Sequence, residues 1–262
     1  MAIGRIRKAT IYITHIESIR VGEYPDIIWV QVYTDTGIVG LGETWYAATT
    51  VEAAIHDHFA PLLVGKDPFA IERHWSNMFR LSDHAGYGGA EMRAISALDI
   101  ALWDIKGKAL GVPVYELLGG AMRDMIWTYG RWDGATPEEC VEHALREVAT
   151  GLTALKGDPF GHQGLFSSVQ SERDAVAKLK AVREAVGDDV ELLVETHGRL
   201  APAAAIRVGL AIEEYRPFGF EEVVPPQNVA AMKRLSDSDN VPFAHGATSA
   251  HQRGSPHLPR HP

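Results

Sequence analysis

The sequence contains one cysteine, no long apolar run and fewer basic than acidic residues, and each shortage argues against a class of protein. Cys140 has no partner for an internal disulfide, which favours a reducing cytoplasm. No apolar run approaches the roughly 20 residues that span a bilayer. The first residues lead into an alternating pattern, not into the apolar core of a signal peptide. The net charge of -9 argues against a general affinity for nucleic acid or anionic membrane.

The remaining composition is that of a soluble globular protein, with 46% hydrophobic and 23% charged residues. Its 262 residues are enough for one large domain or two smaller ones. Residues 1–124 begin with three alternating segments, two of them joined by a turn signal at Asp35–Gly37, and continue as helices, which predicts an α+β domain. Residues 125–246 alternate between apolar strands and helices, which predicts parallel βαβ units.

In the first part we expect strands over Thr10–Ile16, Ile27–Thr34 and Val39–Thr44 and helices over Thr50–Leu63, Ala70–Arg80, Ala90–Leu110 and Pro113–Leu118. In the second part we expect strands over Met125–Tyr129, Leu152–Lys156, Val190–Glu195, Phe218–Glu221 and Val241–Ala244. The intervening helices are Thr136–Thr150, Glu172–Val186, Pro202–Tyr215 and Val229–Leu235. Residues 247–262 are a polar Pro/His/Arg tail that we expect to be disordered. Asp99 and Asp104 fall roughly 140° apart on a helix, which argues against a paired acid/base site.

Polar side chains follow three of the predicted parallel strands. They are Lys156 and Asp158, then Glu195 and His197, then Glu221 and Glu222. Because α/β barrels keep their chemistry at the carboxyl ends of the strands, we expect these groups to converge on one mouth. On an extended strand end, Glu195 and His197 would point the same way. Converging carboxylates suit a hard cation such as Mg²⁺, whereas a single acidic strand end is more often simply solvated.

The segment Ala97–Gly120, which contains Asp-Ile-Ala-Leu-Trp-Asp-Ile-Lys-Gly-Lys, closely resembles the capping domain of the enolase superfamily, mandelate racemase branch, and the resemblance extends to about Gly246. It implies an α+β cap followed by a (β/α)₈ barrel, of which about five strands would be present. It also implies that two cap loops, Glu17–Tyr24 and Trp45–Thr49, close over the barrel mouth and select the substrate. The candidate substrate contacts there are Tyr24, Trp45 and Tyr46, although exposed loop aromatics also serve in packing.

The same resemblance assigns two metal ligands. Phe220–Pro226 is similar to the family's Phe-Glu-Glu-Pro-Val-Pro-Pro, whose first Glu binds Mg²⁺, so the resemblance gives this role to Glu221. Glu195 takes the place of the family's Asp ligand. The third ligand of the family is a Glu, and here Ala247 occupies that position, with His245 or a water as alternative donors.

The remaining site residues follow from an Asp-x-His-Gly-Arg pattern, which the run Glu195–Arg199 resembles. In acid-sugar dehydratases of the galactonate type, this His is the general acid for the departing hydroxyl, a role implied for His197. Lys156 matches a family lysine near the substrate carboxylate. Asp158 replaces the second lysine of the racemase pattern, which favours a dehydratase. The further candidate substrate-binding residues are Asp158, Arg199 and Glu222.

The resemblance therefore implies Mg²⁺-dependent dehydration of a sugar acid, through an enediolate, to a 2-keto-3-deoxy acid by a homo-oligomer. Galactonate is favoured, and mannonate and gluconate are rivals. Residues 248–262 depart from the family pattern. Our hypothesis for this departure is a one-base frameshift in the coding sequence. Sequencing of the gene tests it. The alternative interpretation is a truncated, catalytically inactive remnant that at most binds metal or associates with itself.

Overall fold

The structure is a computed structural model that describes residues 11–83, 88–161, 167–225, 228–238 and 240–246. It divides into two compact units, Met1–Asp124 and Met125–Pro262, and each unit has its own hydrophobic core. The predicted tail over residues 247–262, with Ala247, lies outside the described residues. No helix in the described part of the chain is long and apolar enough to cross a membrane.

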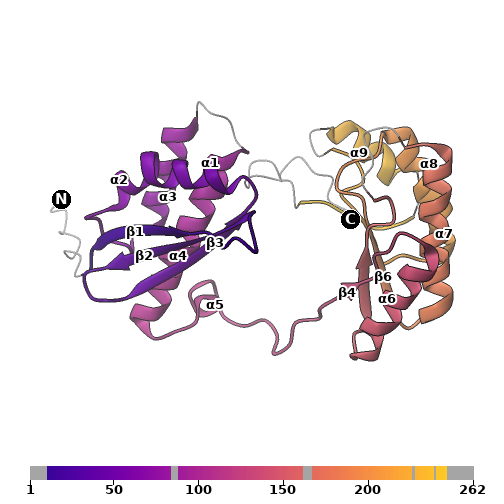
Figure 1. Cartoon of the computed structure of the whole chain (residues 1–262), viewed down its shortest axis with the longest axis horizontal. Coiled ribbons are helices and arrows are strands. Elements are labelled where there is room, and N and C mark those ends of the chain that lie inside the picture. Colours follow the sequence, from indigo (N-terminus) through magenta and orange to yellow (C-terminus); the bar gives the residue numbers. More distant parts are fainter. Residues whose placement is uncertain (1–10, 84–87, 162–166, 226–227, 239, 247–262) are drawn as a thin grey trace, which may run out of the picture. The chain divides into compact units, whose positions relative to one another are not determined.

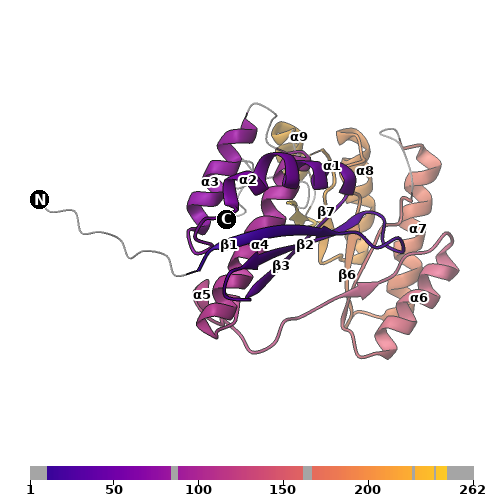
Figure 2. The same ribbon diagram turned by 60° about the vertical axis from the view of Figure 1, so that its left-hand side comes forward.

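The first unit is built on an antiparallel sheet of three strands. Strands β1 (Ile13–Ile19), β2 (Ile27–Thr34) and β3 (Val39–Trp45) lie in that order. Every second residue of β2 is buried, because alternating side chains face opposite sides of the sheet. The long helix α4 (Ala90–Leu110) packs against β3 and β2 (Figure 2). Gly42 permits this close approach, since a Cβ there would collide with the backbone oxygen of Ala97.

The helices of the first unit differ from the prediction mainly at one place. The structure has α1 (Ala48–Ala53), a π-helical segment η1 (Ala54–Phe59), α2 (Ala60–Leu63), α3 (Ile71–Ser82) and α5 (Val114–Leu117). The predicted cap at Thr50 is wrong. The helix starts earlier because the carbonyl oxygen of Ala47 accepts the first helical hydrogen bonds, from the N–H groups of Thr50 and Val51. As predicted, α4 ends at Gly111, which has a left-handed φ of 69°.

The second unit contains, in its described residues, a parallel sheet of five strands in chain order. These are β4 (Gly130–Arg131), β5 (Ala154–Gly157), β6 (Glu191–Glu195), β7 (Gly219–Glu221) and β8 (Phe243–Ala244). Helices α6 (Pro137–Ala149), α7 (Val169–Val186) and α8 (Pro202–Ile212) lie on one side of the sheet (Figure 1). A short 3₁₀ turn, η3 (Glu213–Tyr215), follows α8, and α9 (Val229–Ser236) precedes β8. The predicted fold class, an α+β cap followed by a partial α/β barrel, is confirmed.

Two boundaries in the second unit show what decides them. The predicted strand over Met125–Tyr129 is wrong, because pairing with β5 begins only at Gly130, and Met125, Trp127 and Tyr129 are exposed. An apolar run alone does not distinguish a paired strand from an exposed segment. The predicted cap at Thr136 is confirmed, since its side chain accepts a hydrogen bond from the N–H of Glu139 at 3.3 Å.

Candidate active site

Three charged side chains meet at the carboxyl ends of β5, β6 and β7. Glu195 is in register with Glu221 on the neighbouring strand, and Lys156 is in register with Leu193, two residues before Glu195. Since alternate residues of a strand share a face, all three charged groups lie on the same face of the sheet. The Lys156 Nζ atom donates hydrogen bonds to Glu195 Oε2 at 3.2 Å and to Glu221 Oε2 at 2.9 Å.

This cluster is shielded from water. The exposed fractions of the side chains are 11% for Lys156, 4% for Glu195 and 20% for Glu221. Burial by itself lowers the pKa of Lys156, but hydrogen bonds with Glu221, Tyr129 and Glu195 outweigh it, so the pKa is raised above its usual value. Lys156 is therefore an ammonium group at neutral pH, between two carboxylates.

His197 departs from the extended geometry that the sequence predicted. Strand β6 ends at Glu195, and His197 has a left-handed φ of 53°. The backbone N–H groups of Thr196 and His197 fold back onto Glu195 Oε1, at 3.0 and 2.9 Å. The Glu195 carboxylate is consequently enclosed, whereas the His197 side chain is 59% exposed. The backbone after Glu195 is therefore not extended, and the two side chains differ sharply in exposure.

Asp158, in the loop after β5, holds the imidazole of His197. Its Oδ2 atom lies 3.1 Å from His197 Nδ1 and accepts a hydrogen bond from Arg199 Nη2. Arg199 also donates from Nε to the carbonyl oxygen of Thr196 at 2.7 Å and from Nη1 to that of Gly161. The other nitrogen of His197, Nε2, has no hydrogen-bond partner among the residues that the structure describes. This arrangement leaves Nε2 available for proton transfer.

Glu222 and His245 form a separate buried contact between the ends of β7 and β8. Glu222 Oε1 lies 3.3 Å from His245 Nδ1 and accepts a hydrogen bond from the N–H of Gly246 at 3.1 Å. The neighbouring carboxylate of Glu222 raises the pKa of His245, against the opposing effect of burial. His245 Nε2 lies 3.1 Å from the carbonyl oxygen of Val224. Both residues are thus held by the protein, and the substrate contact predicted for Glu222 stays a prediction.

Lys156, Glu195 and Glu221 form what we call the Lys156 cluster. Its carboxylate oxygens are the type of ligand that a hard cation prefers. Mg²⁺ prefers carboxylate oxygens and is commonly held by one or two carboxylates together with waters. Glu195 Oε2 and Glu221 Oε2 converge on one point, which the Lys156 ammonium group takes. Within the described ranges, no group of three or more acidic, histidine or cysteine side chains has an arrangement that holds a metal. The position of the family's third ligand, Ala247, is outside those ranges.

The three aromatic candidates of the cap are exposed, as a binding role requires. Exposed fractions are 55% for Tyr24, 61% for Trp45 and 58% for Tyr46. Sequence reasoning missed Arg93, whose guanidinium carbon lies 5.7 and 5.5 Å from the ring centroids of Trp45 and Tyr46. Its Nη1 atom also donates to the carbonyl oxygen of Trp45 at 2.9 Å. Arg93 lies 48 residues from Trp45, and no local pattern in the sequence signals the contact.

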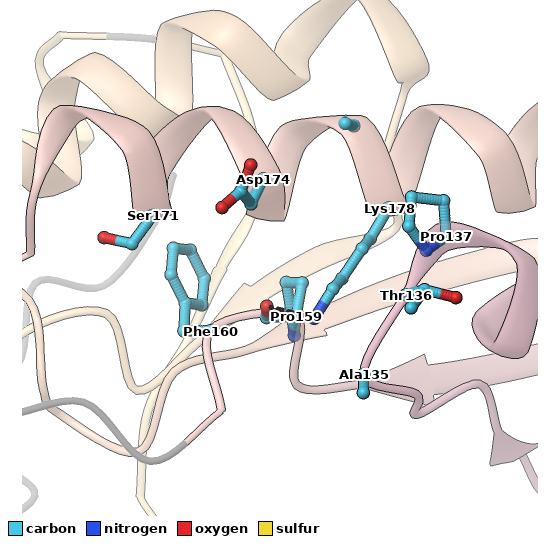
Figure 3. Close-up of a pocket in the computed structure, with 9 residues that line it drawn as sticks. Ala135, Thr136, Pro137, Pro159, Phe160, Ser171, Asp174 and Lys178 are labelled. Atoms are coloured by element: carbon cyan, nitrogen blue, oxygen red, sulfur yellow. Dashed lines mark hydrogen bonds between the residues drawn. The ribbon is translucent and has the colours of Figure 1, made fainter.

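A separate hollow of about 240 Å³ lies beside the start of α6 and the N-terminal part of α7, as far as Lys178 (Figure 3). Pro159 and Phe160 line it from the loop after β5, and Lys178 reaches it from α7. Lys178 Nζ donates to the carbonyl oxygens of Gly134 and Pro159, at 3.1 and 3.3 Å. The lining contains no residue of the Lys156 cluster, so this hollow is distinct from the candidate active site.

Comparison with known proteins identifies the class. The family described as "Mandelate racemase / muconate lactonizing enzyme, N-terminal domain" matches residues 14–119, and "Enolase C-terminal domain-like" matches residues 139–253. A crystal structure of an enolase superfamily member from Salmonella Typhimurium is 33% identical to this chain. It superposes with a TM-score of 0.86 over 94% of this chain and 70% of that chain. The chain therefore belongs to the enolase superfamily, in its mandelate racemase/muconate lactonizing enzyme group, as its motifs predicted.

Among individual relatives, the chain is similar to a D-galactonate dehydratase of Variovorax paradoxus, with 39% identity over 236 residues. This match covers 89% of the chain and 61% of the relative. The chain is also 28% identical to an enolase of Pantoea ananatis whose crystal structure holds D-gluconate and Mg, with a TM-score of 0.84 over 94% of this chain and 68% of that chain. The chain spans about three fifths of the length of the curated relatives that it matches.

Proposed function

We propose that the chain carries the chemistry of an acid-sugar dehydratase: Mg²⁺-dependent loss of water from a sugar acid such as galactonate, giving a 2-keto-3-deoxy acid. The observation that carries the proposal is the placement of an exposed imidazole, held at Nδ1 by Asp158, at the same strand ends as two convergent carboxylates. The dehydratase name of the Variovorax relative supports the reaction. The gluconate and Mg in the Pantoea structure support the substrate class and the metal.

In this proposal each residue has a distinct task. Glu195 and Glu221 would hold the metal, which when bound would draw charge from the substrate carboxylate and so acidify the proton on the adjacent carbon. His197 donates a proton from Nε2 to the departing hydroxyl group, which leaves as water, and the carbon-bound proton passes to solvent. Lys156 is the cation beside the substrate carboxylate. Arg199, Asp158 and Glu222 are further candidates of this unit, and Tyr24, Trp45 and Tyr46 of the cap are separate candidate substrate contacts, in a cytoplasmic homo-oligomer.

A second candidate function is metal binding without turnover. The observation that favours it is that Lys156 and Glu195 are both engaged in ion pairs, so neither is a ready base for the carbon-bound proton. In this reading the chain at most binds Mg²⁺ or associates with copies of itself.

The deciding experiment is a panel of galactonate, gluconate and mannonate, each incubated with Mg²⁺ or with EDTA and assayed for a 2-keto acid. The matched control is His197→Asn, because asparagine tolerates a left-handed φ and lacks a general acid. We expect Mg²⁺-dependent product with one acid and a loss of about 10²–10⁴-fold in the variant. No product from any acid, with Mg²⁺ bound, would reject the dehydratase and leave the second candidate.

A further inference from the structure

The ammonium group of Lys156 lies at the point on which the oxygen atoms of the two proposed metal ligands converge. Its ammonium nitrogen is 2.9 Å from Glu221 Oε2 and 3.2 Å from Glu195 Oε2, and both ion pairs are largely buried. We propose that Lys156 is a built-in cation of this site, and that Mg²⁺ binds by displacing its ammonium group from the two carboxylates. The inference rests on the proposed metal site and not on turnover.

The electrostatics of the cluster require a cation at this point. Two carboxylates in register on adjacent strands, and shielded from water, repel each other unless a positive charge lies between them. The ammonium group supplies that charge from β5, because its four-carbon stem spans the two-residue difference in register. The ring of Tyr129, 5.1 Å from Nζ, adds a second group that favours a cation.

The backbone keeps the ligands in place while the cation changes. Glu195 Oε1 is held by the N–H groups of Thr196 and His197, which leaves only Oε2 to bond with Lys156. Glu221 likewise meets Lys156 through Oε2. The two atoms that bind the ammonium group are therefore the two that are offered to a metal, and the carboxylates need not move far for the exchange.

The two cations exclude each other. Mg²⁺ lies about 2.1 Å from its oxygen ligands, so an ammonium group at 2.9 and 3.2 Å from the same two oxygens would face a divalent ion at close range. The lysine stem is flexible and lets the charge swing away. A substrate carboxylate gives the displaced ammonium a new partner, so Mg²⁺ and a carboxylate ligand should bind with positive coupling.

The test compares Lys156→Met with a matched control, Lys178→Met. Lys178 is a half-buried lysine of the same unit that bonds with backbone carbonyl oxygens. Mg²⁺ affinity is measured by calorimetry, and thermal unfolding is followed in EDTA and in MgCl₂. We expect Lys156→Met to bind Mg²⁺ at least about tenfold more tightly than the parent and to melt lower in EDTA, with recovery in Mg²⁺. Lys178→Met should keep the parent's affinity and gain no dependence on Mg²⁺.

A second variant keeps the test decisive if Lys156→Met unfolds in EDTA. Lys156→Met combined with Glu221→Gln removes one carboxylate together with the ammonium, and should regain stability in EDTA without tight Mg²⁺ binding. The proposal is overturned if folded Lys156→Met binds Mg²⁺ no better than the parent. It is also overturned if this variant stays unfolded in MgCl₂ while the double variant folds. If the parent does not dehydrate any sugar acid but Lys156→Met binds Mg²⁺ more tightly, the dehydratase function is rejected. The displacement of Lys156 by Mg²⁺ is then retained.

Discussion

The Nδ1 atom of His197 lies 3.1 Å from Oδ2 of Asp158, the same oxygen that accepts a hydrogen bond from Arg199. The substrate contact that the sequence predicted for Asp158 stays a prediction, and in the structure its carboxylate lies beside the imidazole. A carboxylate on one ring nitrogen fixes the orientation of the ring and of the other nitrogen. Asp158 is thus placed to orient the imidazole of His197.

This relationship predicts a specific kinetic signature for Asp158→Asn. If Asp158 orients His197, the substitution should lower kcat by about 10²-fold and change KM by less than about twofold. The measurement is steady-state kinetics with the sugar acid that the panel identifies, with the exposed Asp174→Asn as a control. A raised KM with unchanged kcat would instead support the substrate contact that the sequence predicted.

Substitution of Arg183 should have a large effect on the stability of the second unit. It is nearly buried in α7, and its guanidinium donates to the carbonyl oxygens of Gly187, Val190, Tyr215 and Arg216. A lysine has one ammonium group and cannot reproduce this fork. Arg183→Lys should lower the free energy of unfolding in urea by about 2–3 kcal/mol. The exposed Arg146→Lys should change it by less than about 0.5 kcal/mol, and equal effects would contradict the prediction.

Substitution of Gly42 should have an equally large effect on the stability of the first unit. A methyl group at Gly42 would meet the backbone of Ala97 in α4, which cannot rotate away as a side chain would. Gly42→Ala should therefore destabilise this unit by about 3 kcal/mol or more. Gly22→Ala is the control, since a Cβ at Gly22 meets nothing within 4 Å. A stable Gly42→Ala variant would show that α4 packs on β3 less closely than described.

The raised pKa of Asp99 makes the stability of the folded protein depend on pH. Burial, and then the charge of Glu72, raise the pKa of Asp99 from 3.8 to about 6, while a hydrogen bond from Trp103 acts in the opposite direction. The folded state holds the proton more tightly than the unfolded chain. The stability from this group is therefore fully present below about pH 4 and is lost as the pH rises through about 6.

Asp99→Asn removes this ionisation. We expect no gain in the free energy of unfolding at about pH 4 and a gain of about 1 kcal/mol near pH 7.5, a value reduced for partial solvent exposure. Urea unfolding at both pH values measures the difference. The same gain at both would mean that ionisation of Asp99 is not its cause.

The convergence of the Glu195 and Glu221 side chains could be predicted from the sequence, because parallel strands bring their C-terminal ends to one edge of the sheet. Glu195 and Glu221 follow apolar runs that are buried strands, and they are neighbours in register. The family signature in Ala97–Gly120 was likewise sufficient for the cap. These features depend on local patterns of apolar and polar residues, which are visible in the chain.

Contacts between distant side chains were not predictable in this way. The reach of Lys156 to both carboxylates depends on register, which no local pattern states. The backbone of His197 is left-handed where an extended one was expected. Asp158 meets His197 only because two loops, 39 residues apart in the chain, come together.

The separate hydrophobic cores of the two units have a calorimetric consequence. Buried residues form one cluster within each unit, and a unit with its own core unfolds as its own cooperative step. A heating trace should therefore contain two endotherms. Gly42→Ala and Asp99→Asn should displace one of them, and Arg183→Lys and Lys156→Met the other, so that in each experiment the unmoved peak is an internal standard for the peak that moves.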